Sequence, residues 1–164
     1  MWFDMNCEEA INLYVSIFAS VPGANGESKI ESIMRYPERQ LDGPPPGMAG
    51  KVLTAIFYLG GQKFMALDGG PYFKPTGAVS FLVECDDQAQ VDHFWDKLGE
   101  GGDPNAQQCG WLTDKFGFSW QISPKRLGEL LSDPDKATAD RAMDAMLKMK
   151  KIVIADLEKA AYNG

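Results

Sequence analysis

Two amphipathic segments that recur 80 residues apart constrain the fold of this chain more than any other feature. In residues 7–18 and again in residues 88–98, apolar side chains follow the i, i+3, i+4, i+7 spacing of one helix face. They are Ile11, Tyr14, Val15 and Phe18, and then Val91, Phe94, Trp95 and Leu98. Amphipathic helices also recur in unrelated proteins. Here each one follows a short strand-like run and precedes further strands, which favours duplication of one module.

The other apolar runs predict strands that surround these helices. The expected strands cover residues 28–36, 51–59, 62–68 and 78–85. Gly60-Gly61 is a hairpin turn signal. The Pro/Gly-rich residues 40–50 predict a long loop that is functional or mobile, and residues 69–77 predict a linker. The order β-α-β-β-β and then β-α-β-β indicates an α+β fold.

The stretch QQCGWLTDKFGFSWQI at residues 107–122 predicts a β-hairpin. Its residues alternate on both sides of a type I turn that runs from Asp114 to Gly117. The period of two places Trp120 on the apolar face and Gln121 on the opposite face. A buried amide must be hydrogen-bonded, so Gln121 either contacts a ligand or ties neighbouring strands together.

The C-terminal residues 134–162 predict helices, with Pro134 at the first helical position. A stripe of Met143, Met146, Leu147 and Lys150 suggests packing against the domain or against a second subunit, with a ligand role for the thioethers as the alternative. At the other end of the chain, Asn6 is the expected N-cap of the first helix. The expected organisation is a first module at 1–70, a second at 71–124 and a helical tail at 125–164.

Composition excludes several classes of partner. The net charge of −7 and the sequence pI of about 4.7 disfavour nucleic acid, because an acidic chain repels phosphates. No apolar run approaches the roughly 18 residues of a membrane helix, and acidic residues interrupt the start of the chain, so no signal peptide is expected. Cys7, Cys85 and Cys109 are odd in number and widely spaced, which favours a reducing cytoplasm over a disulfide framework.

Four stretches together resemble one known family. They are WFDMNCEEAINLYVSIF, GGQKFMALDGGPYFK, QQCGWLTDKFGFSWQISP and MLKMKKIVIADLEKAA. They resemble the PhnB-like branch, labelled 3-demethylubiquinone-9 3-methyltransferase-like, of the vicinal oxygen chelate superfamily, which includes glyoxalase I, dioxygenases and bleomycin-resistance proteins. The resemblance implies paired βαβββ modules that form a curved mixed sheet around a cavity, a C-terminal helical extension and a homodimer. Only Met1 to Asp4 precede the first helix, so the first strand is shortened or truncated.

Metal-using members of that superfamily carry His and Glu ligands on inner strands. In this chain Gln121 occupies the position of the Glu that follows the turn, and Ala78 stands where the resemblance implies a His. A neutral amide is a weak ligand for a transition metal, and the only imidazole is that of His93, which lies beside a helix stripe. We therefore expect no metal and no cofactor, and we expect His93 to be a solvated helix residue rather than a general base.

The candidate ligand-binding residues come from both modules. They are Gln121, Ser80, Asp68, Cys109, Trp111, Tyr72 and Phe73. Asp68 either forms a turn or faces the cavity as an acceptor or base. Cys109 is either a packing residue or a reactive thiol. Tyr72 and Phe73 either line a cavity mouth or form a hydrophobic seam.

Two functions remain open at this stage. The first is metal-free binding of a small molecule of unknown identity. The second is an enzyme with lyase, oxygenase or methyltransferase activity on a small aromatic or oxygenated substrate. It would act through Asp68, Cys109 or Gln121, but the sequence assigns no catalytic residue. Methyl transfer is disfavoured because no glycine pair opens a helix after a strand, as a nucleotide-like cofactor usually requires.

Overall fold

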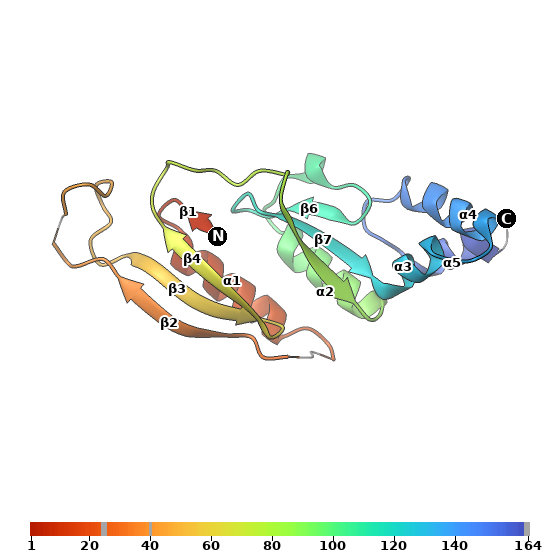
Figure 1. Ribbon diagram of the computed structural model, residues 1–164, viewed down its shortest axis with the longest axis horizontal. Helices are drawn as coiled ribbons and strands as arrows, with labels where there is room; N and C mark the ends of the chain where they lie inside the picture. The colour runs from red at the N-terminus through yellow and green to blue at the C-terminus, as the bar shows by residue number, and fades with distance from the viewer. Residues whose placement is uncertain (24–25, 40, 163–164) are drawn as a thin grey trace. The chain divides into compact units, whose positions relative to one another are not determined.

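The computed structural model describes residues 1–23, 26–39 and 41–162 and divides the chain into two compact units (Figure 1). The first unit is Met1–Pro75 and the second is Thr76–Gly164. Each unit contains one mixed β-sheet with a helix packed on one of its faces, and the second unit also carries the C-terminal helices. The α+β class and the helical extension are therefore confirmed.

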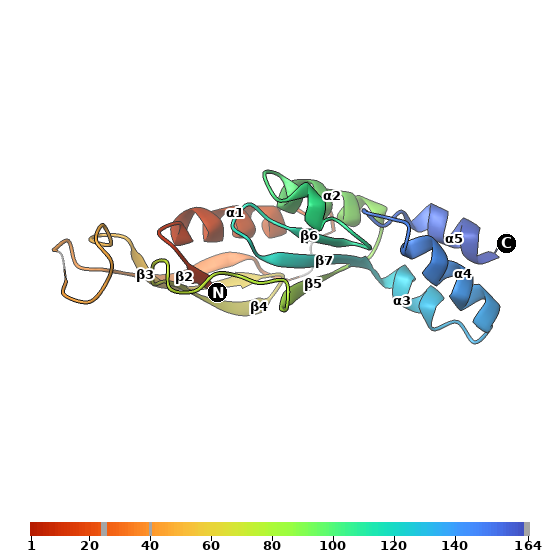
Figure 2. The same ribbon diagram turned by 90° about the horizontal axis from the view of Figure 1, so that it is seen from above.

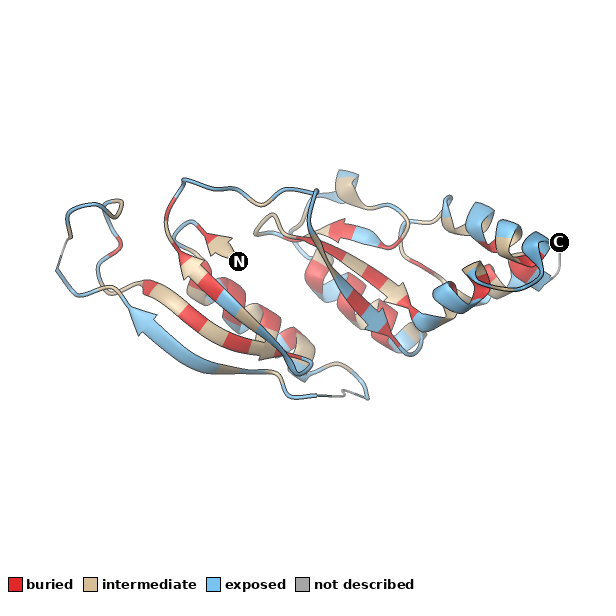
Figure 3. Ribbon diagram, in the orientation of Figure 1, coloured by how far each residue is buried: buried red, intermediate tan, exposed pale blue. Residues whose placement is uncertain are grey.

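The first unit has the order β-α-β-β-β that the sequence predicts. Its elements are β1 (Trp2–Phe3), α1 (Cys7–Ala19), β2 (Lys29–Arg35), β3 (Val52–Leu59) and β4 (Gln62–Asp68). The sheet order is β1-β4-β3-β2, with β1 parallel to β4 and the other pairs antiparallel. Strand β1 has only two residues, as the short segment before the helix suggested. Helix α1 covers one face of this sheet, and β2 is exposed along most of its length (Figures 2 and 3).

The second unit repeats this topology with one strand fewer. Its elements are β5 (Ser80–Cys85), α2 (Gln88–Gly99), the 3-10 turn η1 (Pro104–Ala106), β6 (Trp111–Thr113) and β7 (Ser119–Pro124). The sheet order is β5-β7-β6, with β5 parallel to β7 and β6 antiparallel to β7. In both units the strand before the helix therefore pairs in parallel with the last strand. This shared and uncommon pairing supports the duplication.

Helix-facing residues of each sheet form the core. In the first unit Ala55, Phe57 and Ala66 lie buried under α1. In the second, Trp120 and Ile122 of β7 are almost fully buried, and α2 contributes apolar side chains to the same core. The alternation that was predicted for residues 118–122 is confirmed from Ser119 onward. The preceding strand is shorter than expected, because Cys109 and Gly110 have positive φ angles of 51° and 82° and so interrupt it.

The segment between β2 and β3 is fixed at several points; its residue 40 lies outside the described residues. Met48 is buried, and Pro45 packs so closely on Gly70 that an added Cβ there would overlap the proline ring. The hydroxyl of Tyr36 donates to the carbonyl of Asp68 at 3.0 Å. These contacts give the segment a structural role in the first unit.

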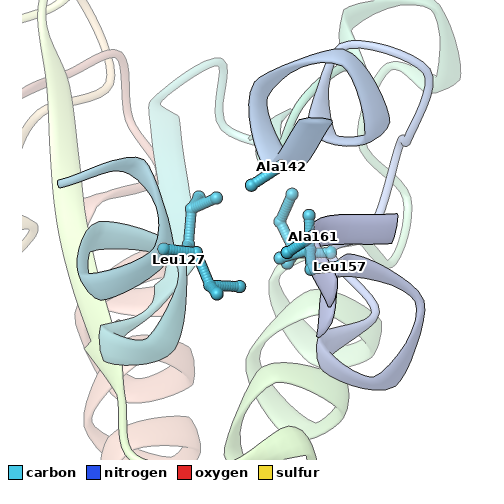
Figure 4. Packing of buried hydrophobic residues seen from close by; sticks show 6 residues of the cluster. Leu127, Ala142, Leu157 and Ala161 are labelled. Carbon is cyan, nitrogen blue, oxygen red and sulfur yellow. The ribbon is translucent and has the colours of Figure 1, made fainter. Parts of the chain in front are cut away.

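Three helices form the C-terminal extension: α3 (Lys125–Leu131), α4 (Lys136–Met146) and α5 (Ile154–Tyr162). They share a small apolar core of Leu127, Leu130, Ala142, Ile152, Leu157 and Ala161, four of which are labelled in Figure 4. The expectation that Pro134 begins a helix was wrong: Asp135 is the N-cap, its side chain accepts from the Ala137 amide, and Pro134 lies outside. Helix α3 lies within the predicted helical tail 125–164, although no sequence pattern marked it as a separate helix. No helix in the described part of the chain is long and apolar enough to cross a bilayer.

The extension is anchored to the second sheet through backbone hydrogen bonds. The amides of Cys109 and Gly110 donate to the carbonyls of Met149 and Lys150, both at 2.8 Å. The Gln88 side chain holds the same segment, because its amide group donates to the Ile152 carbonyl and its oxygen accepts from the amide that starts α5. The extension is thus an integral part of the second unit.

The Met-rich stripe does not pack as a whole against the domain. Met146 packs on the apolar core of the extension, whereas Met143 is 40% exposed and Leu147 is 53% exposed. The residues of α4 that face the core are Thr138, Ala142 and Ala145. Met143 and Leu147 therefore do not pack against the domain as predicted, because Thr138, Ala142 and Ala145 occupy the side of α4 that faces the core. A second subunit as their partner remains a prediction.

Candidate functional site

The face of the second sheet that lies opposite α2 carries a regular grid of polar and exposed apolar side chains. We call it the open face and define it by Ser80, Leu82, Glu84, Trp111, Thr113, Ser119, Gln121 and Ser123. Cross-strand pairing arranges them in rows: Ser80–Ser119–Thr113, Leu82–Gln121–Trp111 and Glu84–Ser123. Strand residues that alternate with the buried core side chains must point to this face.

Gln121 lies at the centre of the grid and joins two strands. Its side-chain nitrogen donates to the Ser80 hydroxyl at 2.7 Å. The bond ties β7 to β5, one of the two roles that were predicted for this amide. The Gln121 oxygen, its second N–H and the Ser80 proton are not used by this bond, so the pair still offers both an acceptor and donors to a ligand.

Apolar surface flanks this polar pair. Leu82 on β5 is 60% exposed and Trp111 on β6 is 37% exposed, and both are cross-strand partners of Gln121. Thr113 and Ser119 lie beside them with their hydroxyl oxygens 3.5 Å apart. An aromatic side chain, an aliphatic side chain and an amide–hydroxyl pair in one row suit a ligand with a flat apolar body and a polar substituent.

A hollow of about 480 Å³ extends the open face where β7 runs into α3. Its lining consists of Leu82, Glu84, Ser123, Pro124, Lys125, Gly128 and Glu129. The Lys125 ammonium lies 2.5 Å from the Asp86 carboxylate. This hydrogen bond lowers the pKa of Asp86 and raises the pKa of Lys125. Both groups therefore stay charged and paired near neutral pH.

Asp114 fixes which side chains of β7 face inward. One carboxylate oxygen accepts from the amides of Phe116 and Phe118 at 2.9 and 3.0 Å, and the other accepts from the Trp120 indole at 2.8 Å. The Gly117 amide closes the turn on the Asp114 carbonyl at 3.0 Å, as the sequence predicts. Because the indole is held under the helix, Gln121 must point to the open face.

Asp68 has a structural task in the first unit. It is 2% exposed, and its two carboxylate oxygens accept from the backbone amides of Met5 at 2.6 Å and Cys7 at 3.1 Å. It therefore caps the start of α1 from a neighbouring strand. Asn6 occupies the N-cap position as predicted, but its side chain makes no capping hydrogen bond, and Asp68 supplies the acceptors instead.

The glycine pair after Asp68 is explained by packing. The Trp2 indole lies on Gly69, where an added Cβ would overlap the ring, and its N–H donates to the Gly70 carbonyl at 2.8 Å. Phe73 meets the same indole edge-on, with ring centroids 4.8 Å apart. Tyr72 and Phe73 are both largely exposed, and they belong to the first unit.

The remaining candidate residues of the second unit lie outside the open face. Cys109 is half-buried with a positive φ, and it precedes β6, next to the tail. His93 is half-buried on α2, and its ring meets Phe94 edge-on. Burial raises the pKa of Cys7 and of Cys85 to about 12, and nearby carboxylates add to the effect, so these two thiols stay protonated. The structure thus brings together Ser80, Trp111 and Gln121 from the sequence candidates.

Leu82, Glu84, Ser123 and Gly128 belong to the site but were not among the residues predicted for it. A signal for the first three was present, because they continue the period of two from Ser80 and Gln121. Gly128 belongs to α3, the first part of the predicted helical tail, for which no separate pattern was recognised. Within residues 1–23, 26–39 and 41–162, no three His, Cys, Asp or Glu side chains converge where they could hold a metal ion.

Comparison with known proteins identifies the relatives of this two-module fold. The model of the 3-demethylubiquinone-9 3-methyltransferase family matches residues 1–123, which includes both sheets almost completely. The chain belongs to the 3-demethylubiquinone-9 3-methyltransferase family, the PhnB-like group. The predicted resemblance is therefore confirmed, and the solved relatives support a glyoxalase-like fold.

Two solved structures show the extent of the likeness. A PhnB protein from Bacillus cereus, named for 3-demethylubiquinone-9 3-methyltransferase, is 35% identical with a TM-score of 0.59, covering 76% of this chain and 95% of that one. Protein PA1353 from Pseudomonas aeruginosa is 24% identical with a TM-score of 0.57, covering 76% and 92%, and indicates the fold alone. No curated protein matches the chain. The family match ends at residue 123, so α3, α4 and α5 lie beyond it.

Proposed function

We propose that this PhnB-like family member binds a small molecule on the open face of its second sheet, without a metal. The observation that carries the proposal is the row Leu82–Gln121–Trp111, in which two exposed apolar side chains flank a polar amide. Leucine and tryptophan side chains left this exposed on a regular sheet face favour a ligand that covers them. The amide–hydroxyl pair of Gln121 and Ser80 would orient it.

Binding is favoured over catalysis by the chemistry of the grid. Apart from Glu84 at one end, its side chains are hydroxyls, one amide, leucine and tryptophan, none of which titrates near neutral pH. Of the residues considered as bases or nucleophiles, Asp68 already accepts two backbone hydrogen bonds, and Cys109 lies outside the strand. An enzyme acting on a small aromatic or oxygenated substrate is the second candidate function. The expected enclosing cavity, the homodimer and the cytoplasmic location remain predictions.

Methyl transfer, the activity in the name of the Bacillus cereus relative, has no support in the glycine pairs of this chain. Gly60 and Gly61 form the turn of the β3–β4 hairpin with positive φ angles of 56° and 84°. Gly69 and Gly70 accommodate Trp2 and Pro45. Each of these four glycines has a packing or turn role in the first unit.

A thermal-shift screen of small aromatic and oxygenated molecules tests the proposal. A ligand that binds only the folded protein raises the melting temperature by mass action. The hits are then incubated with the protein and followed by mass spectrometry. We expect stabilisation without consumption of ligand. Turnover of a hit would favour the enzyme, and stoichiometric zinc, nickel or iron in the purified protein would overturn metal-free binding.

A further inference from the structure

The hollow at the end of the open face has the size of a ligand pocket but lies away from the central amide. Its volume of about 480 Å³ falls within the usual range for small-molecule sites. It begins at Leu82 and continues past Glu84, which is two residues further along the same face of β5. Two residues of a strand span about 7 Å. A ligand lying on Leu82 therefore reaches Glu84 with a substituent of that length.

Gly128 keeps one wall of this hollow bare. It occupies the middle of α3, where glycine weakens a helix relative to alanine. A Cβ added at Gly128 would meet nothing within 4 Å, and its φ is not positive, so neither packing nor backbone conformation requires glycine there. The glycine leaves the space beside this helix open to a ligand.

Around the hollow one carboxylate forms no ion pair within the described part of the chain, although it lies near a cation: the pKa of Lys125 is raised by its hydrogen bond to Asp86 and, further, by the charge of Glu84. Lys125 pairs with Asp86, and Arg126 pairs with both Glu129 and Glu158. The Glu84 carboxylate is exposed, and among the residues that the structure describes it makes no hydrogen bond or ion pair. The hollow therefore has an excess of negative charge, which disfavours an anionic ligand group and favours a cationic one.

We propose that the ligand of this protein is an aromatic amine, with its ring on Leu82 and Trp111 and its ammonium group beside Glu84. The inference rests on the proposed function and adds to it the charge of the ligand. The aromatic ring would cover the apolar side chains of the central row, and the Gln121 oxygen would accept a hydrogen bond from a ring N–H. The ammonium group would lie in the hollow.

Three probes that share an indole ring separate these contributions: tryptamine is cationic, tryptophol is neutral and indoleacetate is anionic. Their dissociation constants are measured by titration of the isotope-labelled full chain, followed by amide chemical shifts. We expect tryptamine to bind about two- to fivefold more tightly than tryptophol at low salt, with indoleacetate the weakest. The preference should shrink as added salt screens the charge.

Two variants locate the effect. Glu84→Gln should abolish the preference for tryptamine over tryptophol, while Glu100→Gln, which changes an exposed glutamate at the end of α2, should keep it. Gly128→Ala should weaken tryptamine binding while the melting temperature stays equal or rises, which separates filling of the hollow from misfolding.

The outcomes distinguish this inference from the proposed function. Equal binding of tryptamine and tryptophol, with shifts on the open face, would refute the cationic subsite and leave ligand binding intact. A preference that survives Glu84→Gln would also refute the subsite. Absence of shifts on the open face with all three probes at millimolar concentration would refute an aromatic-amine ligand, while the thermal-shift screen still tests the proposed function.

Discussion

Replacing Asp68 by alanine should destabilise the first unit and leave the open face of the second unit unchanged. The carboxylate caps α1 by accepting from the Met5 and Cys7 amides at 2.6 and 3.1 Å, and the side chain is almost fully buried. Alanine removes both hydrogen bonds and leaves two amides without an acceptor. Because water cannot readily replace a buried acceptor, the loss is not compensated by solvent.

The expected cost follows from these two contacts. Loss of an N-cap costs about 1 to 2 kcal/mol, and a hydrogen bond to a charged group is worth about 1.5 to 3 kcal/mol. Since the two estimates describe the same contacts, they are not added, and Asp68→Ala should lower the free energy of unfolding by about 3 kcal/mol. Asp68→Asn keeps the size and one acceptor oxygen, so a loss of about 1 to 2 kcal/mol is expected.

Urea denaturation followed by circular dichroism measures this loss, and amide hydrogen exchange at Met5 and Cys7 localises it. Faster exchange at these two amides is expected, with normal binding of ligands to the second unit. A change in stability below about 0.5 kcal/mol, the usual size for an uninvolved surface residue, would refute the capping role. Lost turnover of a substrate with unchanged stability would instead identify Asp68 as a base.

Three further predictions follow from local geometry. Gly110→Ala should lower the free energy of unfolding by more than about 2 kcal/mol, because the φ of 82° is unfavourable for alanine and the new Cβ would lie 2.8 Å from the Ile122 carbonyl oxygen. Denaturant unfolding measures this loss, and an unchanged free energy of unfolding would contradict the prediction. Cys109 should react with iodoacetamide before Cys7 and Cys85, because burial raises the pKa of both of those thiols to about 12. Mass spectrometry after a short exposure to the reagent should find Cys109 alkylated first. The hydrogen bond from Lys151 lowers the pKa of Asp92, so this contact stabilises the tail above the unfolded-state pKa of about 3.9 and is lost as the pH falls through the lower folded-state value. Carboxyl-carbon NMR should show that pKa rising in Lys151→Ala, and an unchanged value would contradict the pairing.

Most of the fold could be predicted from the periodic spacing of apolar residues. The two amphipathic helices and the order of strands could be predicted because each depends on local alternation of apolar residues. The inward position of Trp120 and the outward position of Gln121 followed from the period of two and are confirmed by burial and strand pairing. Register then determined that Gln121 meets Ser80, a residue 41 positions away, which the sequence alone did not specify.

Long-range contacts explain what the sequence did not predict. The cap of α1 comes from Asp68 rather than from the adjacent Asn6, and only the parallel pairing of β1 with β4 brings Asp68 near the helix. Helix α3 falls within the predicted helical tail but was not recognised as a separate helix, because it is short, follows β7 directly and contains Gly128. The hollow beside Glu84 depends on that helix, so it could not be expected before α3 was known.

The most direct test of ligand binding at the open face compares Gln121→Ala with a matched control. The best stabilising molecule from the screen is titrated into labelled wild type, Gln121→Ala and Gln62→Ala, which removes an exposed glutamine from the first sheet. We predict shifts at the amides of Leu82, Trp111 and Gln121, and binding weakened by about 1 to 3 kcal/mol in Gln121→Ala alone. Equal affinity in all three proteins, or shifts confined to other surfaces, would contradict a ligand site at the open face.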